Sequence, residues 1–200
     1  MSHIGKGDFP LQNFYTFGAN EFRWLQFLHT FLQLMASMKT LLIVYHSMTG
    51  GALQMAQAAE AGAASESSIK VRLLHAPEVE ADDVLAADGY LFVTPEYLAA
   101  ISGLMKDFFD RTYYQVLEKI NGRPYAALIC AGSDGQNAAR QIERIATGWR
   151  LKPIASPTII CTHAQSTDEI LASKNIGMPE RDLCKELGAA MATGLEMGIF

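Results

Sequence analysis

The sequence is poor in cysteine and has no excess of basic residues. Its 200 residues include three cysteines, Cys130, Cys161 and Cys184, and no CxxC pair or His/Cys cluster has metal-ligand spacing. This odd, scattered set argues against a disulfide framework and indicates reduced thiols in a reducing, cytoplasmic compartment. The formal net charge is -5, so the chain offers no basic surface for nucleic acid or an anionic membrane.

The sequence also lacks an apolar run long enough to cross a membrane. The most apolar stretch near the N-terminus, residues 22–35, is interrupted by four polar side chains: Arg23, Gln26, His29 and Gln33. A signal peptide cleaved near Ala36 and Ser37 is disfavoured, because its apolar region would contain Gln and His and a core strand begins directly after Met38. We expect residues 1–37 to be an N-terminal extension outside the core fold. A docking amphipathic helix is the alternative.

Half of the residues are apolar and 18% are charged, which is typical of a folded globular chain. After Met38, short apolar runs alternate with longer helical stretches. The run Leu41–Tyr45 is continuous and apolar, as in a strand covered on both faces. Further strands are predicted at residues 69–75, 89–94, 125–130 and 153–161. Helices are predicted at residues 51–64, 82–87, 103–119, 136–149 and 179–197.

Strands that alternate with helices build a parallel sheet with helices on both faces. Residues 38–200 are therefore predicted to form one α/β domain, a doubly wound three-layer sandwich around a five-stranded parallel sheet. Pro157 lies inside the last predicted strand, which must then be an edge strand or carry a bulge. Ligands bind such sheets beyond the carboxyl ends of the strands. The residues that follow the strands there are His46 and Ser47, His75, Thr94 and Pro95, Ala131 and Gly132, and Thr162 and His163.

The connection after the first strand is suited to binding a phosphate. It consists of His46, Ser47, Met48, Thr49, Gly50, Gly51 and Ala52. The two glycines let the backbone approach a ligand closely, and the start of the following helix offers N–H groups and a positive dipole end. Ser47 and Thr49 add hydroxyl donors. An ordinary tight turn capped by one of these two side chains is the alternative.

Two other phosphate-binding motifs do not match. A Walker A loop requires a Lys after its last glycine, and none follows Gly51. A dinucleotide fingerprint requires G-x-G-x-x-G and an acidic residue after the second strand, where His75 stands.

The segment Ser47–Gly51 instead resembles the S/T-x-T-G-x-T phosphate loop of flavodoxins and NAD(P)H-dependent FMN reductases. The resemblance implies a flavodoxin-like fold with strand order 2-1-3-4-5 and FMN at this switch point. The last hydroxyl of the pattern is replaced by Ala52, so one phosphate contact of the family is missing. Backbone N–H groups are the groups that can replace it.

A second segment carries the same resemblance. Thr94–Tyr97 followed by Ile101–Arg111 is similar to the T-P-E-Y…G-x-L-K-D-F-x-D segment of flavodoxin-like reductases, which flanks the isoalloxazine ring. Pro95 fixes the turn out of the strand, and Tyr97 offers an aromatic face to a planar ring. The cofactor contacts expected here are Pro95, Glu96, Tyr97, Leu98, Ser102 and Gly103.

The loop after the fourth predicted strand places glycines on either side of a Ser-Asp pair. Backbone amides can approach the polar edge of a flavin there, and Asp134 can cap the helix that follows. The cofactor-binding residues expected in this loop are Ala131, Gly132, Ser133, Asp134 and Gly135. Ala131 breaks the G-x-S-x-G pattern and no ordered Asp/His pair accompanies Ser133, so a hydrolase is disfavoured.

Together the three loops predict FMN as the cofactor, with the flavin carrying the chemistry and no catalytic side chain or metal. By resemblance, the chain is an oxidoreductase that takes electrons from NAD(P)H and reduces a small acceptor such as a quinone or a free flavin. The alternative is a one-electron carrier that docks to a protein redox partner, a role for which the net charge is modest. Related reductases are often dimers, so the resemblance also implies a homodimer.

Two further classes fit less well. A phosphoryl-receiver module needs an Asp after the third strand, where Thr94 stands, and a cofactor-free scaffold stays open because of Ala52. We expect His46, His75 and His163 at the rim of the site, because no Asp or Glu is placed to orient them for acid–base chemistry.

Overall fold

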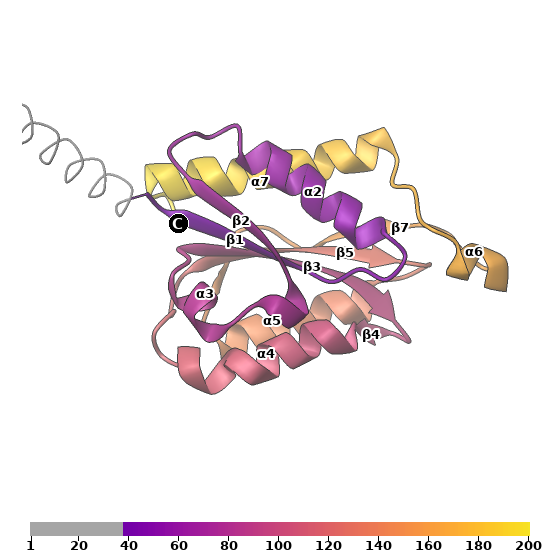
Figure 1. Ribbon diagram of the computed structural model, residues 1–200, viewed down its shortest axis with the longest axis horizontal. Helices are drawn as coiled ribbons and strands as arrows, with labels where there is room; N and C mark the ends of the chain where they lie inside the picture. Colours follow the sequence, from indigo (N-terminus) through magenta and orange to yellow (C-terminus); the bar gives the residue numbers. More distant parts are fainter. Residues whose placement is uncertain (1–37) are drawn as a thin grey trace, which may run out of the picture. The chain divides into compact units, whose positions relative to one another are not determined.

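A parallel sheet forms the centre of the structure, a computed structural model that describes residues 38–200 (Figure 1). Its strands are β1 (Thr40–Tyr45), β2 (Lys70–His75), β3 (Gly89–Tyr97), β4 (Ala100–Ile101), β5 (Pro124–Ala131), β6 (Lys152–Pro153) and β7 (Thr158–Cys161). They are arranged in the order β2-β1-β3-β5-β6, with β7 also paired to β5. The predicted order 2-1-3-4-5 is confirmed, because β5 is the fourth predicted strand and β6 and β7 are two parts of the fifth.

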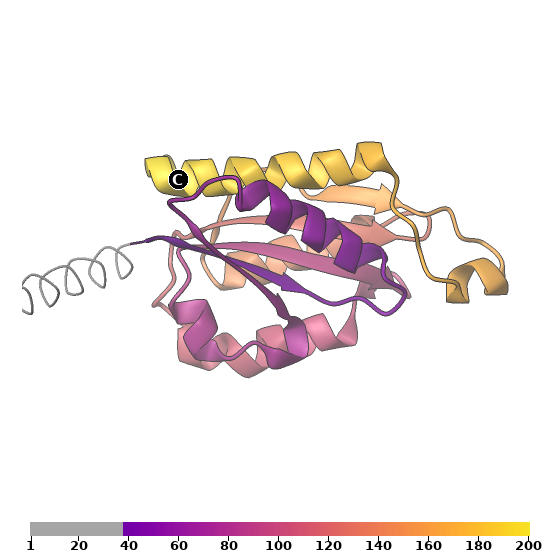
Figure 2. The ribbon, with the colours of Figure 1, turned by 45° about the horizontal axis from the view of Figure 1, so that its top comes forward.

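Helices cover both faces of this sheet, as the two views in Figures 1 and 2 show. One face carries α2 (Gly51–Ala63) and α7 (Met178–Met197). The other carries α3 (Ala81–Leu85), α4 (Gly103–Val116) and α5 (Gln136–Gly148). The shorter helical segments are the 3-10 turn η1 (Ala76–Glu78) and α6 (Thr167–Leu171). The doubly wound α/β class is therefore confirmed. The expectations for residues 1–37, and the boundary drawn at Met38, stay predictions because that segment lies outside the described residues.

The strand sequences explain why the sheet is buried on both faces. Successive side chains of a strand point to opposite faces, and Leu41, Leu42, Ile43 and Val44 of β1 are all fully buried. Leu41 and Ile43 pack in the core under α2 and α7, whereas Leu42 and Val44 pack in the core under α4 and α5. A continuous apolar run is thus required to fill two cores at once.

The two helical faces are packed with different residues. Phe92, Phe108, Phe109 and Trp149 form a cluster of aromatic rings under α4 and α5. On the other face, α2 and α7 cross at Gly62 and Gly188, where an added Cβ would overlap the backbone of the facing helix. Small residues at this crossing allow close helix packing, which fixes where α2 begins at the carboxyl end of β1.

Three details differ from the sequence prediction. The fifth strand is split, because residues 154–157 leave the ladder between Pro153 and β7, and β7 pairs with β5 at the sheet edge, as Pro157 led us to expect. The loop after β3 contains an antiparallel hairpin, in which Glu96 and Tyr97 pair with β4. The helix α6 was not predicted. Within residues 38–200, no helix is both long and apolar enough to span a membrane.

Candidate functional site

A cavity of about 280 Å³ lies at the carboxyl end of the sheet. Seven of the predicted cofactor-binding residues line it: Met48, Thr49, Pro95, Glu96, Tyr97, Ala131 and Gly132. They come from the connections after β1, β3 and β5, which the topology places side by side. Parallel strands end at the same edge of a sheet, so three loops distant in the sequence converge on one cavity.

The start of α2 has the geometry that the sequence led us to expect of a phosphate-binding element. Gly50 adopts the left-handed conformation with φ 85°, and its N–H donates to Ser47 Oγ at 3.1 Å. No side chain in the described range caps the α2 N-terminus, and its first turn contains no acidic residue. The unpaired N–H groups and the positive end of the helix dipole therefore stay available to an anion.

At position 51, only glycine fits without displacing its neighbours. A Cβ on Gly51 would lie 2.6 Å from Cys130 Sγ and 3.3 Å from Lys174 Cβ. The backbone of the phosphate loop is consequently held between β5 and the segment that precedes α7. Ala52 is fully buried beside it, so a hydroxyl at this position would need a hydrogen-bond partner.

Two buried polar atoms near the cavity have no hydrogen-bond partner within the described chain: Nδ1 of His46 and the hydroxyl of Tyr97. The two rings meet edge to face with centroids 6.2 Å apart, and the His75 ring stacks on His46 at 5.5 Å. Buried polar groups are nearly always paired in folded proteins, so two neighbouring exceptions beside a cavity fit a bound polar ligand.

The titration of these groups follows from their burial. Burial, and then the neighbouring His75 ring, lower the pKa of His46 below its usual value, so the imidazole is neutral at pH 7. Burial also raises the pKa of Tyr97. The Met48 backbone amide partly offsets that rise, although it does not reach the geometry of a hydrogen bond.

Glu96 and Ser102 hold the loops rather than face the cavity freely. Glu96 accepts from the N–H groups of Gly135 at 2.7 Å and Ala138 at 3.4 Å, so it caps the N-terminus of α5. Ser102 is fully buried and accepts from the Met105 N–H at 3.2 Å, which caps α4. The Glu96 contacts join the β3 loop to the start of α5, and the Ser102 contact fixes the start of α4.

The remaining predicted residues lie around the cavity without lining it. Leu98 is fully exposed at the tip of the β3–β4 hairpin, where it and Ala99 both have positive φ. Gly103, Ser133 and Asp134 are exposed, and Gly135 is the left-handed N-cap of α5. The assignment of cofactor contacts to all of these residues stays a prediction.

The cysteines give no nucleophile to this site. Burial raises the pKa of the Cys130 thiol to about 11, an effect that the Lys174 ammonium partly offsets. Cys161 is half-buried, and its pKa is also raised, first by burial and then by Asp134 and Glu96. Thiols with raised pKa values stay protonated at neutral pH, where the thiolate is the reactive form. Residues 38–200 also contain no group of three His, Cys, Asp or Glu arranged to hold a metal.

The sequence prediction missed one wall of the cavity. This wall belongs to residues 162–177, the segment between β7 and α7, which we call the strap. Ile170, Leu171 and Lys174 of the strap line the cavity, and the Lys174 N–H donates to the Thr49 carbonyl oxygen at 2.7 Å. No motif marks these residues, because a connection of this length can fold in many ways and only tertiary contacts place it over the phosphate loop.

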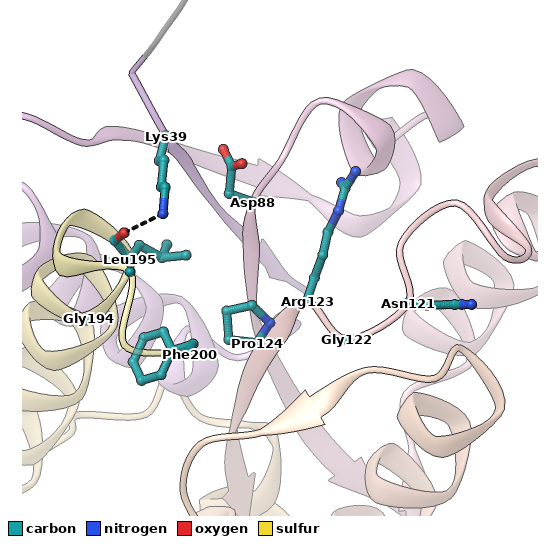
Figure 3. Close-up of a pocket in the computed structure, with 10 residues that line it drawn as sticks. Lys39, Asp88, Asn121, Gly122, Arg123, Pro124, Gly194, Leu195 and Phe200 are labelled. Atoms are coloured by element: carbon teal, nitrogen blue, oxygen red, sulfur yellow. Dashed lines mark hydrogen bonds between the residues drawn. The ribbon is translucent and has the colours of Figure 1, made fainter.

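A second cavity, of about 230 Å³, lies at the amino end of the sheet (Figure 3). None of the predicted site residues lines it. Its charged groups are already engaged within the chain: Lys39 Nζ donates to the Leu195 carbonyl oxygen at 2.9 Å, and Asp88 accepts from the Thr40 N–H at 2.7 Å. Arg123 donates to the carbonyl oxygens of Val84, Leu85 and Ala87 and to the Tyr90 hydroxyl. This end therefore lacks the free polar groups of the carboxyl end.

The arrangement is that of a flavodoxin-like fold, and solved structures agree. An archaeal flavodoxin superposes with a TM-score of 0.64 at 19% identity, over 78% of this chain and 99% of that chain. A flavodoxin-type WrbA-like protein from Agrobacterium tumefaciens superposes with a TM-score of 0.61 at 17% identity, over 80% of this chain and 98% of that chain. These similarities establish the fold.

Sequence comparison adds named relatives. Residues 75–166 match the family of NADPH-dependent FMN reductases. A flavodoxin from Aquifex aeolicus is 34% identical over 49% of this chain and 53% of its own length. An NAD(P)H dehydrogenase (quinone) from Acidithiobacillus ferrooxidans is 35% identical over 38% of this chain and 48% of its own length. The chain thus spans about half the length of these two relatives.

The resemblance to flavodoxins and NAD(P)H-dependent FMN reductases is thereby confirmed. The family match contains the β3 and β5 loops and begins after the phosphate loop, at His75. The similarity therefore bears on the part of the site that would hold the ring, whereas the phosphate-binding part is supported by the geometry of α2.

Proposed function

We propose that this chain is an FMN-binding oxidoreductase that uses NAD(P)H to reduce a small acceptor such as a quinone or a free flavin. One observation carries the proposal. The uncapped start of α2 lies beside a cavity of about 280 Å³ that is lined by all three predicted loops. The similarity to named FMN and quinone reductases supports the same class.

The residues present fit FMN. The N–H groups at the start of α2 would bind the phosphate, with Ser47 holding the Gly50 amide in place. Tyr97 would flank the ring, and the unpaired Tyr97 hydroxyl and His46 Nδ1 would hydrogen-bond its polar groups. When bound, FMN supplies the electron-carrying ring, while this chain binds, orients and shields it.

Among the described residues that line the cavity, Glu96 and Lys174 hydrogen-bond to backbone groups and not to an ionised partner. His46 is neutral, so it offers a hydrogen bond without placing a second charge beside the cofactor. Ile170 and Leu171 of the strap are exposed apolar side chains at the cavity, and they would exclude water from one side of the ring.

The test is a visible spectrum of the purified protein, followed by anaerobic addition of NADH or NADPH. We expect flavin absorption in the purified protein, or its appearance after reconstitution with FMN. We also expect NADH or NADPH to bleach this absorption without a partner protein. Absence of flavin binding would contradict the proposal. The same assay would show which of NADH and NADPH reduces the flavin more effectively.

A one-electron carrier is the second candidate, and the similarity to the Aquifex aeolicus flavodoxin favours it. A carrier would bind FMN in the same place but would need a partner reductase, so neither nicotinamide would bleach it alone. We further propose a cytoplasmic location, consistent with three cysteines that form no disulfide. A homodimer is an implication of the resemblance alone, and gel filtration would test it.

A further inference from the structure

We propose that Gln54 is a positioning residue for the phosphate end of the cofactor, because its side-chain amide holds the strap against the phosphate loop. The proposal rests on the FMN site proposed above. It assigns a role to a residue that lies outside the phosphate-loop motif and does not line the cavity.

The Gln54 amide makes four hydrogen bonds, one to the phosphate loop, two to the strap and one to α7 directly after it. Its Nε2 donates to the carbonyl oxygens of Gly50 at 3.1 Å and Lys174 at 2.6 Å. Its Oε1 accepts from the Ile176 N–H at 3.1 Å and from the Arg181 guanidinium. A primary amide has two N–H donors and two lone pairs on its oxygen, so the full capacity of this side chain is used.

The bonds are made at the point where the helix N-terminus must present its N–H groups. Gly50 is the left-handed N-cap of α2, and its carbonyl oxygen also accepts the first intrahelical bond, from the Gln54 N–H at 3.1 Å. The strap lies directly against the next residue, because a Cβ on Gly51 would be 3.3 Å from Lys174 Cβ. A shift of the strap would therefore displace the groups that we expect to bind the phosphate.

The charges of the strap and of the first turn of α7 fit an anion at this place. Lys174 of the strap lines the cavity, and Arg181 of α7 donates to the Gln54 amide oxygen, so two cations lie near the start of α2. The Lys174 ammonium donates to the carbonyl oxygens of Ile170 at 2.8 Å and Ala172 at 2.7 Å, which fastens the end of α6. Holding the strap in place thus also holds positive charge near the phosphate loop.

Glutamine at this position acts through conformation rather than by contact with the ligand. Without the amide, the loop and strap keep the single Lys174–Thr49 backbone bond and populate the binding arrangement less often. Apparent affinity falls in proportion to that population. Loss of the four partly buried hydrogen bonds of this amide corresponds to about a tenfold to hundredfold change in such an equilibrium.

The experiment compares Gln54→Met with Gln57→Met in the full-length chain. Methionine has nearly the shape of glutamine without its hydrogen bonds, and Gln57 is an exposed glutamine of the same helix. Dissociation constants for FMN and for riboflavin, which lacks the phosphate, are measured by quenching of flavin fluorescence. We expect Gln54→Met to weaken FMN at least tenfold and riboflavin less than threefold, as order-of-magnitude figures. Gln57→Met should change neither.

The outcomes separate this inference from the proposed function. Failure of the unaltered chain to bind either flavin would refute the FMN site, and the role of Gln54 with it. Binding by the unaltered chain, with equal losses of FMN and riboflavin in Gln54→Met, would show a general structural role and overturn the inference alone. Unchanged FMN affinity would do the same.

A measurement on the unaltered chain guards against a variant that does not fold. Hydrogen exchange is followed at the amides of Lys174 and Ile176, with and without FMN or riboflavin. We expect FMN to slow exchange of both strap amides together with the first turn of α2, and riboflavin to slow them less. The inference would be overturned if FMN did not slow hydrogen exchange at the strap amides.

Discussion

The amino end and the carboxyl end of the sheet each carry a cavity, and they differ in how their polar groups are paired. At the amino end, the charged groups of Lys39, Asp88 and Arg123 all bond to the chain itself. At the carboxyl end, His46 Nδ1 and the Tyr97 hydroxyl are buried without a partner among the described residues. Unpaired buried groups cost stability, so their place at one end only indicates that this end is built for a ligand.

The difference follows from the direction of the strands. The strands begin at the amino end, and the polar groups of the short turns there are paired by side chains of the chain itself. At the carboxyl end the connections after β1, β3 and β5 lead to the starts of α2, α4 and α5, and helix starts leave N–H groups unpaired. Glu96 caps α5 and Ser102 caps α4, whereas α2 has no such cap within residues 38–200. Among these three helix starts, that of α2 is the one whose N–H groups stay open to an anion.

The largest expected effect comes from removing the Arg123 hydrogen bonds at the amino end of the sheet. Arg123→Met removes five hydrogen bonds, four of them to backbone carbonyl oxygens and one to the Tyr90 hydroxyl. We expect a loss of about 2–3 kcal/mol in the free energy of unfolding, measured by urea denaturation, because buried carbonyl groups lose their donor.

Flavin affinity should stay within about twofold in Arg123→Met, since the site lies at the other end. The matched control is Arg150→Met, whose exposed side chain makes an ion pair with Glu118 at 3.4 Å. That change should cost less than about 0.5 kcal/mol. Equal losses in the two variants would remove the distinction between the ends.

A smaller effect, of opposite sign, is expected at the carboxyl end. Tyr97→Phe removes a buried hydroxyl that has no partner in the described chain, so the flavin-free protein should gain up to about 1 kcal/mol in thermal unfolding. The same change should weaken FMN by about threefold to tenfold, because the ligand loses a hydrogen bond.

Tyr114→Phe is the control for this pair of measurements, because Tyr114 is 82% exposed. It should change neither stability nor affinity. If Tyr97→Phe destabilised the flavin-free protein, its hydroxyl would have a partner within the fold, and the comparison of the two ends would fail.

The smallest expected effect is a dependence of stability on pH, which comes from the buried His46 at the carboxyl end. The folded-state pKa of His46 is lowered by burial and then by His75, so the unfolded chain binds more protons than the folded chain. Stability from this group is therefore present above the unfolded pKa, near 6.5, and is lost as the pH falls through that value toward the lower folded pKa.

Unfolding of the flavin-free protein by urea at pH 5.0 and 7.5 measures this contribution of His46 to the free energy of unfolding. We expect His46→Gln to reduce the loss of stability at the lower pH, whereas His163→Gln, at an exposed position, should leave it unchanged. Identical pH profiles for His46→Gln and the unaltered chain would contradict a buried, neutral His46.

Much of the fold could be predicted from local patterns. The continuous apolar run in β1 requires burial on both faces, and the alternation with helices requires parallel pairing. The strand order was implied by the resemblance to flavodoxins, and the structure confirms it. Pro157 correctly indicated an edge strand. The hairpin after β3 was missed, because Leu98 and Ala99 at its tip are not the Asn-Gly type of residues that mark a tight turn.

The candidate site was predicted in part for a similar reason. Glycines and hydroxyls at strand ends have a local meaning, so Thr49 and Gly132 could be placed at the cavity. Glu96 caps α5 by accepting from Gly135, which lies 39 positions further along the chain. Local sequence patterns do not extend over that separation. Neither Lys174 nor Gln54 carries a motif, and both are recognised only by what they contact.

The sequence by itself determined the α/β class and the edge of the sheet where a ligand would bind, because these follow from periodicity and from the direction of parallel strands, whereas the strand order was implied by the resemblance to flavodoxins. Only the tertiary structure decided which polar groups at that edge are satisfied and which stay open. It brought the strap across the phosphate loop and joined them through Gln54. Such contacts join residues about 120 positions apart, as between Gln54 and Lys174, so they exist only once the chain has folded.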